Sequence, residues 1–268
     1  MKRFLAVIAV GLLASCAMAP LVPSDAVRDL APTGKLRAAI NTGNAVLAQK
    51  DERTGEVRGI SVDLARELAR RLDVPVEFVP YDSAGRVAAD VKSGKWDIEF
   101  YALDPARATE VDFSPPYVVI EGGYVVRKDS PLKAIEDFDR KGIRIAVGNK
   151  SAMDLYLTRT IKDAQLVRTP TTPDAVPHFL ANQLEAAAGV KAPLVRMAEK
   201  DPALRVIPGR FMAIEQAMAI PKGRDAGARY LRAFVEDVRA NGFVAAGLER
   251  SGQHDATVAK QVGSDSTK

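Results

Sequence analysis

WDIEFYALDPARATEVDFSPPYVVIEGGYVVR, residues 96–127, contains three kinds of segment in succession. Residues 96–103 are an apolar run with the length of a buried strand, and a short polar segment with Arg107 follows them. Residues 118–127 are extended in character and contain two glycines. This order predicts a buried strand that ends just before an arginine, and then an extended crossing into another part of the molecule.

The segments before this stretch predict an α/β unit. Strands are expected at residues 35–40 and 74–79, and helices at residues 57–73 and 85–92. The first helix is indicated by apolar residues at every fourth position, namely Ile60, Leu64, Leu68 and Leu72. The order β-α-β-α-β is typical of an open, mostly parallel sheet that is covered by helices.

The same pattern recurs after the crossing, which predicts a second α/β lobe. Its strands are expected at residues 143–147 and 165–168 and its helices at residues 151–162 and 173–182. A second extended stretch occupies residues 211–221, and two crossings between two lobes make a natural hinge. The predicted division is residues 34–120 plus 216–252 for lobe 1 and residues 121–215 for lobe 2.

The C-terminal part of the chain is predicted to form a helix followed by a tail. An apolar face indicates a helix at residues 226–241, where Gly242 suits a left-handed cap, and this helix is expected to pack on lobe 1. Residues 253–268 are polar and small, and they are expected to be disordered.

The N-terminus indicates export. Two basic residues precede an uncharged apolar run at residues 4–14, which is too short to span a bilayer. Removal of residues 1–19 fits the AMA sequence before Pro20. Removal of residues 1–15 fits LASC, which resembles a lipobox and would leave a diacylated Cys16 as a firm membrane anchor. Both alternatives place the protein in the periplasm, either free or tethered.

Composition excludes several classes of function. Cys16 is the only cysteine, so the folded part has no internal disulfide and no thiolate metal site. The net charge is +4 without a basic block, which disfavours nucleic-acid binding. The sequence has two histidines, no His-Glu-x-x-His, no Gly-x-Ser-x-Gly and no phosphate loop. Neither a cofactor nor a bound metal is expected.

Six short segments in a fixed order carry a family resemblance. They are GKLR at 34–37, GISVDLA at 59–65, SGKWD at 93–97, DPAR at 104–107, DFSPPY at 112–117 and IAVG at 145–148. From about Gly34 to Gly252 the chain resembles family 3 of the bacterial extracellular solute-binding proteins, the amino-acid-type receptors of ABC importers. The resemblance implies a periplasmic binding protein type II fold, and a monomer that delivers a small carboxylate-bearing solute to the permease.

The resemblance assigns a ligand role to Arg107, which matches the family arginine that binds an α-carboxylate. A guanidinium pairs bidentately with a carboxylate, and such charge-assisted hydrogen bonds are strong. In lobe 2, Ser151 and the Ala152 amide lie at an expected helix N-terminus, which suits an anion. Ser151 serves equally well as a simple N-cap.

Departures from the family pattern affect this site. The family commonly has threonine where Asp104 stands and a hydroxyl residue where Ala102 stands, so an acid lies near Arg107 and an anion-binding hydroxyl is lost. The family also has an aromatic residue over the ligand where this chain reads NTGNAVL at residues 41–47. Asn44 in this stretch is a candidate ligand contact.

The tyrosines are candidates to replace that aromatic cover. Tyr81 is the first of them, with Tyr101 and Tyr117 as alternatives, although each is also a common core residue.

The resemblance leaves recognition of an amine open. Amino-acid members bind the α-ammonium with a lobe 2 aspartate, and the corresponding stretch here reads EAAAGVK at residues 185–191. Glu121 and Glu99, and less directly Glu215, are candidates to supply the missing charge. A ligand without an α-amine, such as a keto acid, explains the loss equally well.

Two other functions use the same fold. A periplasmic dehydratase of the arogenate or prephenate type needs a positioned acid, for which Glu185 and Glu121 are the candidates. A sensor that reports its ligand to a membrane receptor would use the same cleft. Transport without catalysis is the favoured prediction.

Overall fold

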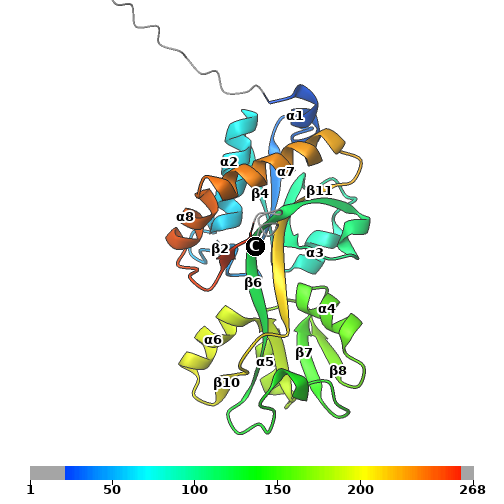
Figure 1. The fold of residues 1–268 in the computed structure, drawn as a ribbon, viewed down its shortest axis with the longest axis vertical. Coiled ribbons are helices and arrows are strands. Elements are labelled where there is room, and N and C mark those ends of the chain that lie inside the picture. Colours follow the sequence, from blue (N-terminus) through cyan, green and yellow to red (C-terminus); the bar gives the residue numbers. More distant parts are fainter. Residues whose placement is uncertain (1–21, 261–268) are drawn as a thin grey trace, which may run out of the picture.

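The computed structural model describes residues 22–260, which form two α/β lobes joined by two long strands (Figure 1). The prediction of two lobes and two crossings is confirmed. The predicted signal sequence, Cys16 and residues 261–268 lie outside the described residues. Within residues 22–260, no helix has the length and apolarity needed to cross a membrane.

Lobe 1 contains most of the helices and the N-terminal strands. Its strands are β1 (Leu36–Asn41), β2 (Gln49–Lys50), β3 (Val57–Arg58), β4 (Val76–Tyr81), β5 (Ile98–Ala102) and β12 (Thr257–Val258). Its helices are α1 (Ser24–Leu30), α2 (Ile60–Leu72), α3 (Ala84–Ala89), the 3₁₀ turn η1 (Arg107–Thr109), α7 (Asp225–Ala240) and α8 (Phe243–Arg250).

Lobe 2 is formed by the middle of the chain. Its strands are β7 (Arg144–Gly148), β8 (Gln165–Thr169), β9 (Ala186–Val190) and β10 (Leu204–Val206), and its helices are η2 (Ile135–Asp137), α4 (Ala152–Thr160), α5 (Ala175–Ala181) and α6 (Lys191–Lys200). The crossings are β6 (Val111–Arg127) and β11 (Met212–Pro221). The predicted lobe boundaries at 120/121 and 215/216 fall inside these two strands.

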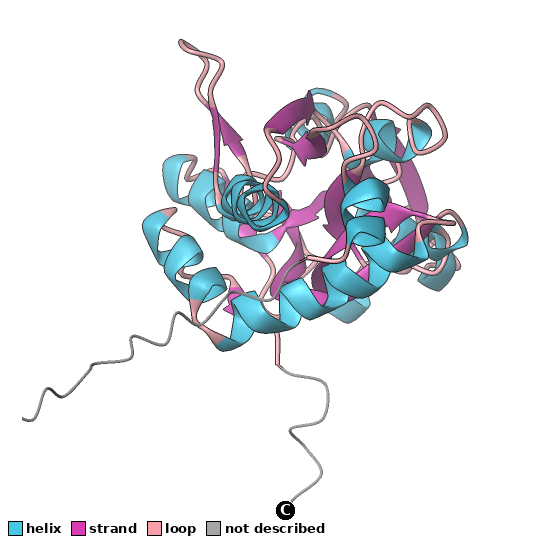
Figure 2. Ribbon diagram, turned by 90° about the horizontal axis from the view of Figure 1, so that it is seen from above, coloured by secondary structure: helices cyan, strands magenta, loops and turns pink. Residues whose placement is uncertain are grey.

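One sheet continues through both lobes in the order β4-β1-β5-β11-β6-β9-β7-β8. The outer strands pair in parallel, β1 with β4 and β5 in lobe 1 and β7 with β8 and β9 in lobe 2. The central pairs β5–β11, β11–β6 and β6–β9 are antiparallel. Helices surround the strands when the molecule is seen from above (Figure 2). The crossings β11 and β6 therefore lie at the centre of this sheet, between the parallel strands of lobe 1 and those of lobe 2.

Helix α2 illustrates how the sequence pattern becomes packing. Its four periodic apolar residues, Ile60, Leu64, Leu68 and Leu72, are at most 4% exposed. Each such burial contributes about 1.5–3 kcal/mol. The helix begins at Ile60 rather than at residue 57, because Val57 and Arg58 pair with β2 and because Gly59 adopts φ 118°. A Cβ at Gly59 would lie 2.5 Å from the Leu47 carbonyl oxygen.

The prediction that the tail is disordered is wrong for residues 253–260. Thr257 and Val258 pair with β6, and the Ala259 amide donates to the Tyr117 carbonyl at 3.1 Å. Gln253 and Ala259 are each 6% exposed. The composition of the segment is polar, but its few apolar residues and its backbone groups complete the edge of lobe 1.

Two other regions differ from the sequence prediction. Helix α1 occupies the lead-in before β1 and packs on α7, which covers lobe 1 as predicted and is followed by Gly242 at φ 83°. Strand β9 and helix α6 were not predicted, because AAAGV has neither alternation nor β-branched residues before its last position. All five residues of β9 are buried.

Candidate functional site

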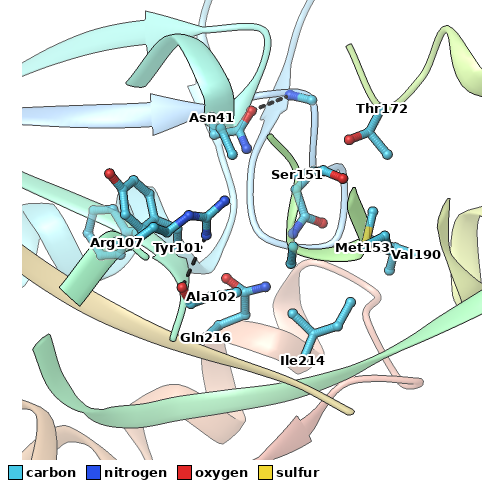
Figure 3. A pocket seen from close by; sticks show the side chains of 15 residues that line it. Asn41, Tyr101, Ala102, Arg107, Ser151, Met153, Thr172, Val190, Ile214 and Gln216 are labelled. Carbon is cyan, nitrogen blue, oxygen red and sulfur yellow. Dashed lines mark hydrogen bonds between the residues drawn. The ribbon is translucent and has the colours of Figure 1, made fainter. Parts of the chain in front are cut away.

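A cavity lies between the lobes and contains about 400 Å³ of empty space, part of which opens to solvent. Both lobes and the β11 crossing line it (Figure 3). Its polar side chains are Asn41, Asn44, Arg107, Ser151, Thr172 and Gln216. Its larger apolar side chains are Phe100, Tyr101, Met153, Val190 and Ile214.

Arg107 spans the boundary between the lobes. It follows β5 in the turn η1 and is only 7% exposed. Its Nη1 donates to the Ala102 carbonyl at 3.1 Å, and its Nη2 donates to the Lys150 carbonyl of lobe 2 at 3.0 Å. The guanidinium carbon lies 4.4 Å from the centre of the Tyr101 ring. A guanidinium has further N–H donors beyond these two bonds.

The facing wall in lobe 2 is a helix N-terminus. Ser151 caps α4, and its Oγ accepts from the Asp154 amide at 3.1 Å. The first-turn N–H groups of an α-helix have no partner within the helix. Ala152 and Met153 of this first turn line the cavity. Lys150 has φ 54°, a left-handed conformation that directs its carbonyl oxygen to Arg107.

The structure brings five of the predicted site residues together and leaves three outside. Those that line the cavity are Asn44, Ala102, Arg107, Ser151 and Ala152.

The other three have different partners. Asp104 forms an ion pair with Arg159 of α4 at 2.9 Å, and the Tyr81 hydroxyl donates to Asp90 at 2.9 Å. Glu121 lines a neighbouring hollow, which shares Val190 with the cavity, and it pairs with Lys191 and Arg210.

Several lining residues were missed by sequence reasoning. Gln216 and Ile214 lie on β11, Thr172 follows β8, and Val190 ends β9. The sequence did contain a signal for Gln216, because a glutamine inside the largely apolar run MAIEQAMAI is unusual in a buried strand. In the structure Gln216 is indeed buried, with 3% of its surface exposed. Thr172 also follows the rule that ligands bind beyond the carboxyl ends of parallel strands.

Glu99 lies in the core of lobe 1, close to the site. It is completely buried, and neither carboxyl oxygen has a hydrogen-bond partner in the described part of the chain. Its neighbours across the sheet are Ala39 and Ala219. Burial raises the pKa of the Glu99 carboxyl well above its usual value, and the charge of Arg107 opposes this rise.

Contacts between the lobes show a closed cleft. The Arg107–Lys150 bond and the Asp104–Arg159 ion pair both connect lobe 1 to lobe 2. Gly85 of α3 also meets lobe 2 closely, since a Cβ there would lie 2.9 Å from the Asn149 carbonyl oxygen.

Comparison with known proteins identifies relatives of the whole folded part. The profile of the bacterial extracellular solute-binding proteins, family 3, matches residues 36–252. A glutamine-binding protein of Geobacillus stearothermophilus is 25% identical over 183 residues, which are 66% of this chain and 69% of that protein.

Solved structures show the same fold. A solute receptor for L-cysteine of Neisseria gonorrhoeae has a TM-score of 0.73 at 24% identity and covers 85% of this chain and 92% of its own. An ancestral amino acid-binding protein, a precursor of cyclohexadienyl dehydratase, has a TM-score of 0.71 at 22% identity, with coverages of 84% and 97%. The two-lobed type II periplasmic binding protein fold is therefore confirmed.

Gly85→Ala is expected to weaken ligand binding about tenfold or more, because the added methyl group obstructs closure at Asn149. Alanine favours a helix more than glycine does, so the ligand-free protein should be at least as stable as the wild type. Isothermal titration calorimetry and thermal unfolding measure the two effects. Unchanged affinity would show that α3 does not limit closure.

Glu99→Gln is expected to change the pH dependence of stability. The folded state holds the Glu99 proton after the unfolded chain has lost it near pH 4.5, so ionisation costs the wild type stability as the pH rises. Between pH 5 and pH 8 the variant should lose at least about 1 kcal/mol less than the wild type in urea unfolding. The exposed Glu215→Gln is the control, and parallel profiles for Glu99→Gln and the wild type would contradict the assignment.

Proposed function

Because the chain belongs to family 3 of the bacterial extracellular solute-binding proteins, we propose that it is the substrate-binding component of an ABC importer. It holds a small carboxylate-bearing solute, such as an amino acid or a related organic acid, in the cavity between its lobes. The carboxylate binds to Arg107.

The position of Arg107 is the single observation that carries this proposal. It is the one charged side chain among the described residues that line the cavity, and it contacts both lobes. The planar guanidinium can pair with both oxygens of a carboxylate, and the Tyr101 ring lies 4.4 Å from the guanidinium carbon. The amides at the α4 N-terminus add donors for the same anion.

Closure of the lobes converts this binding into a transport signal. A ligand that contacts both lobes stabilises the closed form, and the closed outer surface is what a permease recognises. Micromolar affinity corresponds to about −8 kcal/mol. One charged fork, several amide hydrogen bonds and the apolar walls are sufficient for a value of this size.

The dehydratase alternative lacks a positioned acid. Glu185 pairs with Arg144 at 2.9 Å and lies outside the cavity, and Glu121 pairs with Lys191 and Arg210. No carboxylate lines the cavity in the described part of the chain. We therefore favour transport over catalysis. A sensor for a membrane receptor would use the same cavity, and we place this function second to transport as well.

Export and assembly complete the proposal. The mature protein works in the periplasm as a monomer, with permease subunits as its protein partner and without nucleic acid. It is either free after removal of residues 1–19 or anchored through Cys16 after removal of residues 1–15.

Arg107→Ala is expected to cost about 2–5 kcal/mol of binding free energy, since the carboxylate would lose its partner inside the closed cleft. Arg107→Lys keeps the charge without the fork, and it should bind with intermediate affinity. Arg70→Ala removes the same charge from the exposed surface of α2 and serves as the control. Calorimetry measures all three, and wild-type affinity in both Arg107 variants would refute the proposal.

The mass of the exported chain is expected to show a processed N-terminus. Intact-mass spectrometry should find a chain that begins at Pro20, or one that begins at Cys16 with a diacylglycerol. The Cys16→Ala variant should abolish only the second form. An exported protein that retains Met1 would contradict both alternatives.

A further inference from the structure

We infer that the solute is a compact acid with one negative charge and no ammonium group, such as a 2-oxo or 2-hydroxy acid. This inference rests on the proposed function, because it assumes that a carboxylate binds to Arg107. The charges and hydrogen-bond donors of the cavity then indicate which groups the ligand carries beside its carboxylate.

The charge of the cavity fits a monoanion. Arg107 is a cation, and the other polar side chains in its described lining are neutral amides and hydroxyls. A bound carboxylate neutralises the guanidinium. An α-amino acid would add an ammonium with no carboxylate to accept from it.

Four acidic side chains near the cavity are directed elsewhere. Asp104 pairs with Arg159 and Glu121 with Lys191 and Arg210. Asp154 accepts from the Lys150 amide at 2.8 Å and pairs with Arg168 at 3.0 Å. Glu99 is completely buried and does not line the cavity. None of the four is positioned to accept from a ligand ammonium.

The neutral groups also favour donation over acceptance. The Asn41 Oδ1 accepts from the Gly43 amide at 3.0 Å, and the Asn44 Oδ1 accepts from the Val46 amide at 3.3 Å. The NH₂ groups of both side chains therefore remain available as hydrogen-bond donors. The Ser151 Oγ likewise accepts from the Asp154 amide, which leaves its O–H as a donor.

The nearby carbonyl oxygens are similarly occupied. Those of Ala102 and Lys150 already accept from Arg107. An oxo or hydroxyl oxygen next to the carboxylate can accept from the NH₂ groups of Asn41 or Asn44. An ammonium has three donors and no acceptor, and among the described lining side chains it would find only neutral oxygens, such as those of Gln216 and Thr172, and no carboxylate.

The free space also favours a compact ligand. The cavity contains about 400 Å³ of empty space even when the part that opens to solvent is included. Val190, Met153 and Ile214 form the apolar part of the wall, which accommodates a short aliphatic chain. The cavity therefore suits an acid of a few carbon atoms.

Calorimetry with matched pairs of ligands tests the inference on the full protein after unfolding and refolding. The pairs are pyruvate with L-alanine and 2-oxobutyrate with L-2-aminobutyrate, and DL-lactate is the hydroxy acid. We expect at least one amine-free acid to bind about 100-fold tighter than its amino counterpart, given the cost of an unpaired buried charge.

The possible outcomes separate the inference from the proposed function. Equal or tighter binding of the amino acids, with binding lost in Arg107→Ala, overturns the inference and leaves the carboxylate proposal intact. Failure of every acid to bind, or binding that is indifferent to Arg107→Ala, overturns both.

Val190→Asp supplies the missing acid from lobe 2, and Val190→Asn is its neutral control. The aspartate variant should bind L-alanine or L-2-aminobutyrate more tightly than the wild type and the oxo acid at least tenfold more weakly. The asparagine variant should retain the preference for the oxo acid. An oxo-acid preference that is unchanged in a folded Val190→Asp variant would overturn the inference.

Discussion

The buried guanidinium of Arg107 is the constraint around which the cleft is organised. It donates to a carbonyl of lobe 1 and a carbonyl of lobe 2, and the face of Tyr101 lies against it. A charge that is 7% exposed must be compensated by polar partners or by an opposite charge. The two carbonyls provide only dipoles, so a ligand carboxylate is the natural partner that completes the site.

The neighbouring structure follows from that constraint. Lys150 adopts a left-handed backbone conformation, and its carbonyl accepts from Arg107. Ser151 caps α4, whose first turn lines the cavity. Glu99, behind Arg107, is better neutral than charged, because burial raises its pKa.

Much of this arrangement could be predicted from the sequence. The fold follows from apolar periodicity and from six short segments, and the role of Arg107 from its match to the family arginine that binds a carboxylate. Asp104 and Glu121 were wrongly expected at the cavity, because their partners Arg159 and Arg210 lie 55 and 89 residues away along the chain. The direction of the Asn41 and Asn44 amides depends on backbone contacts that only a folded structure contains.

A crystal structure of the protein with the tightest-binding acid would show directly whether Arg107 holds the carboxylate. We predict that both carboxylate oxygens lie within hydrogen-bond distance of the Arg107 guanidinium, with further contacts to the α4 amides or to Asn41 and Asn44. A ligand carboxylate bound elsewhere, with Arg107 still engaged only by the Ala102 and Lys150 carbonyls, would contradict it.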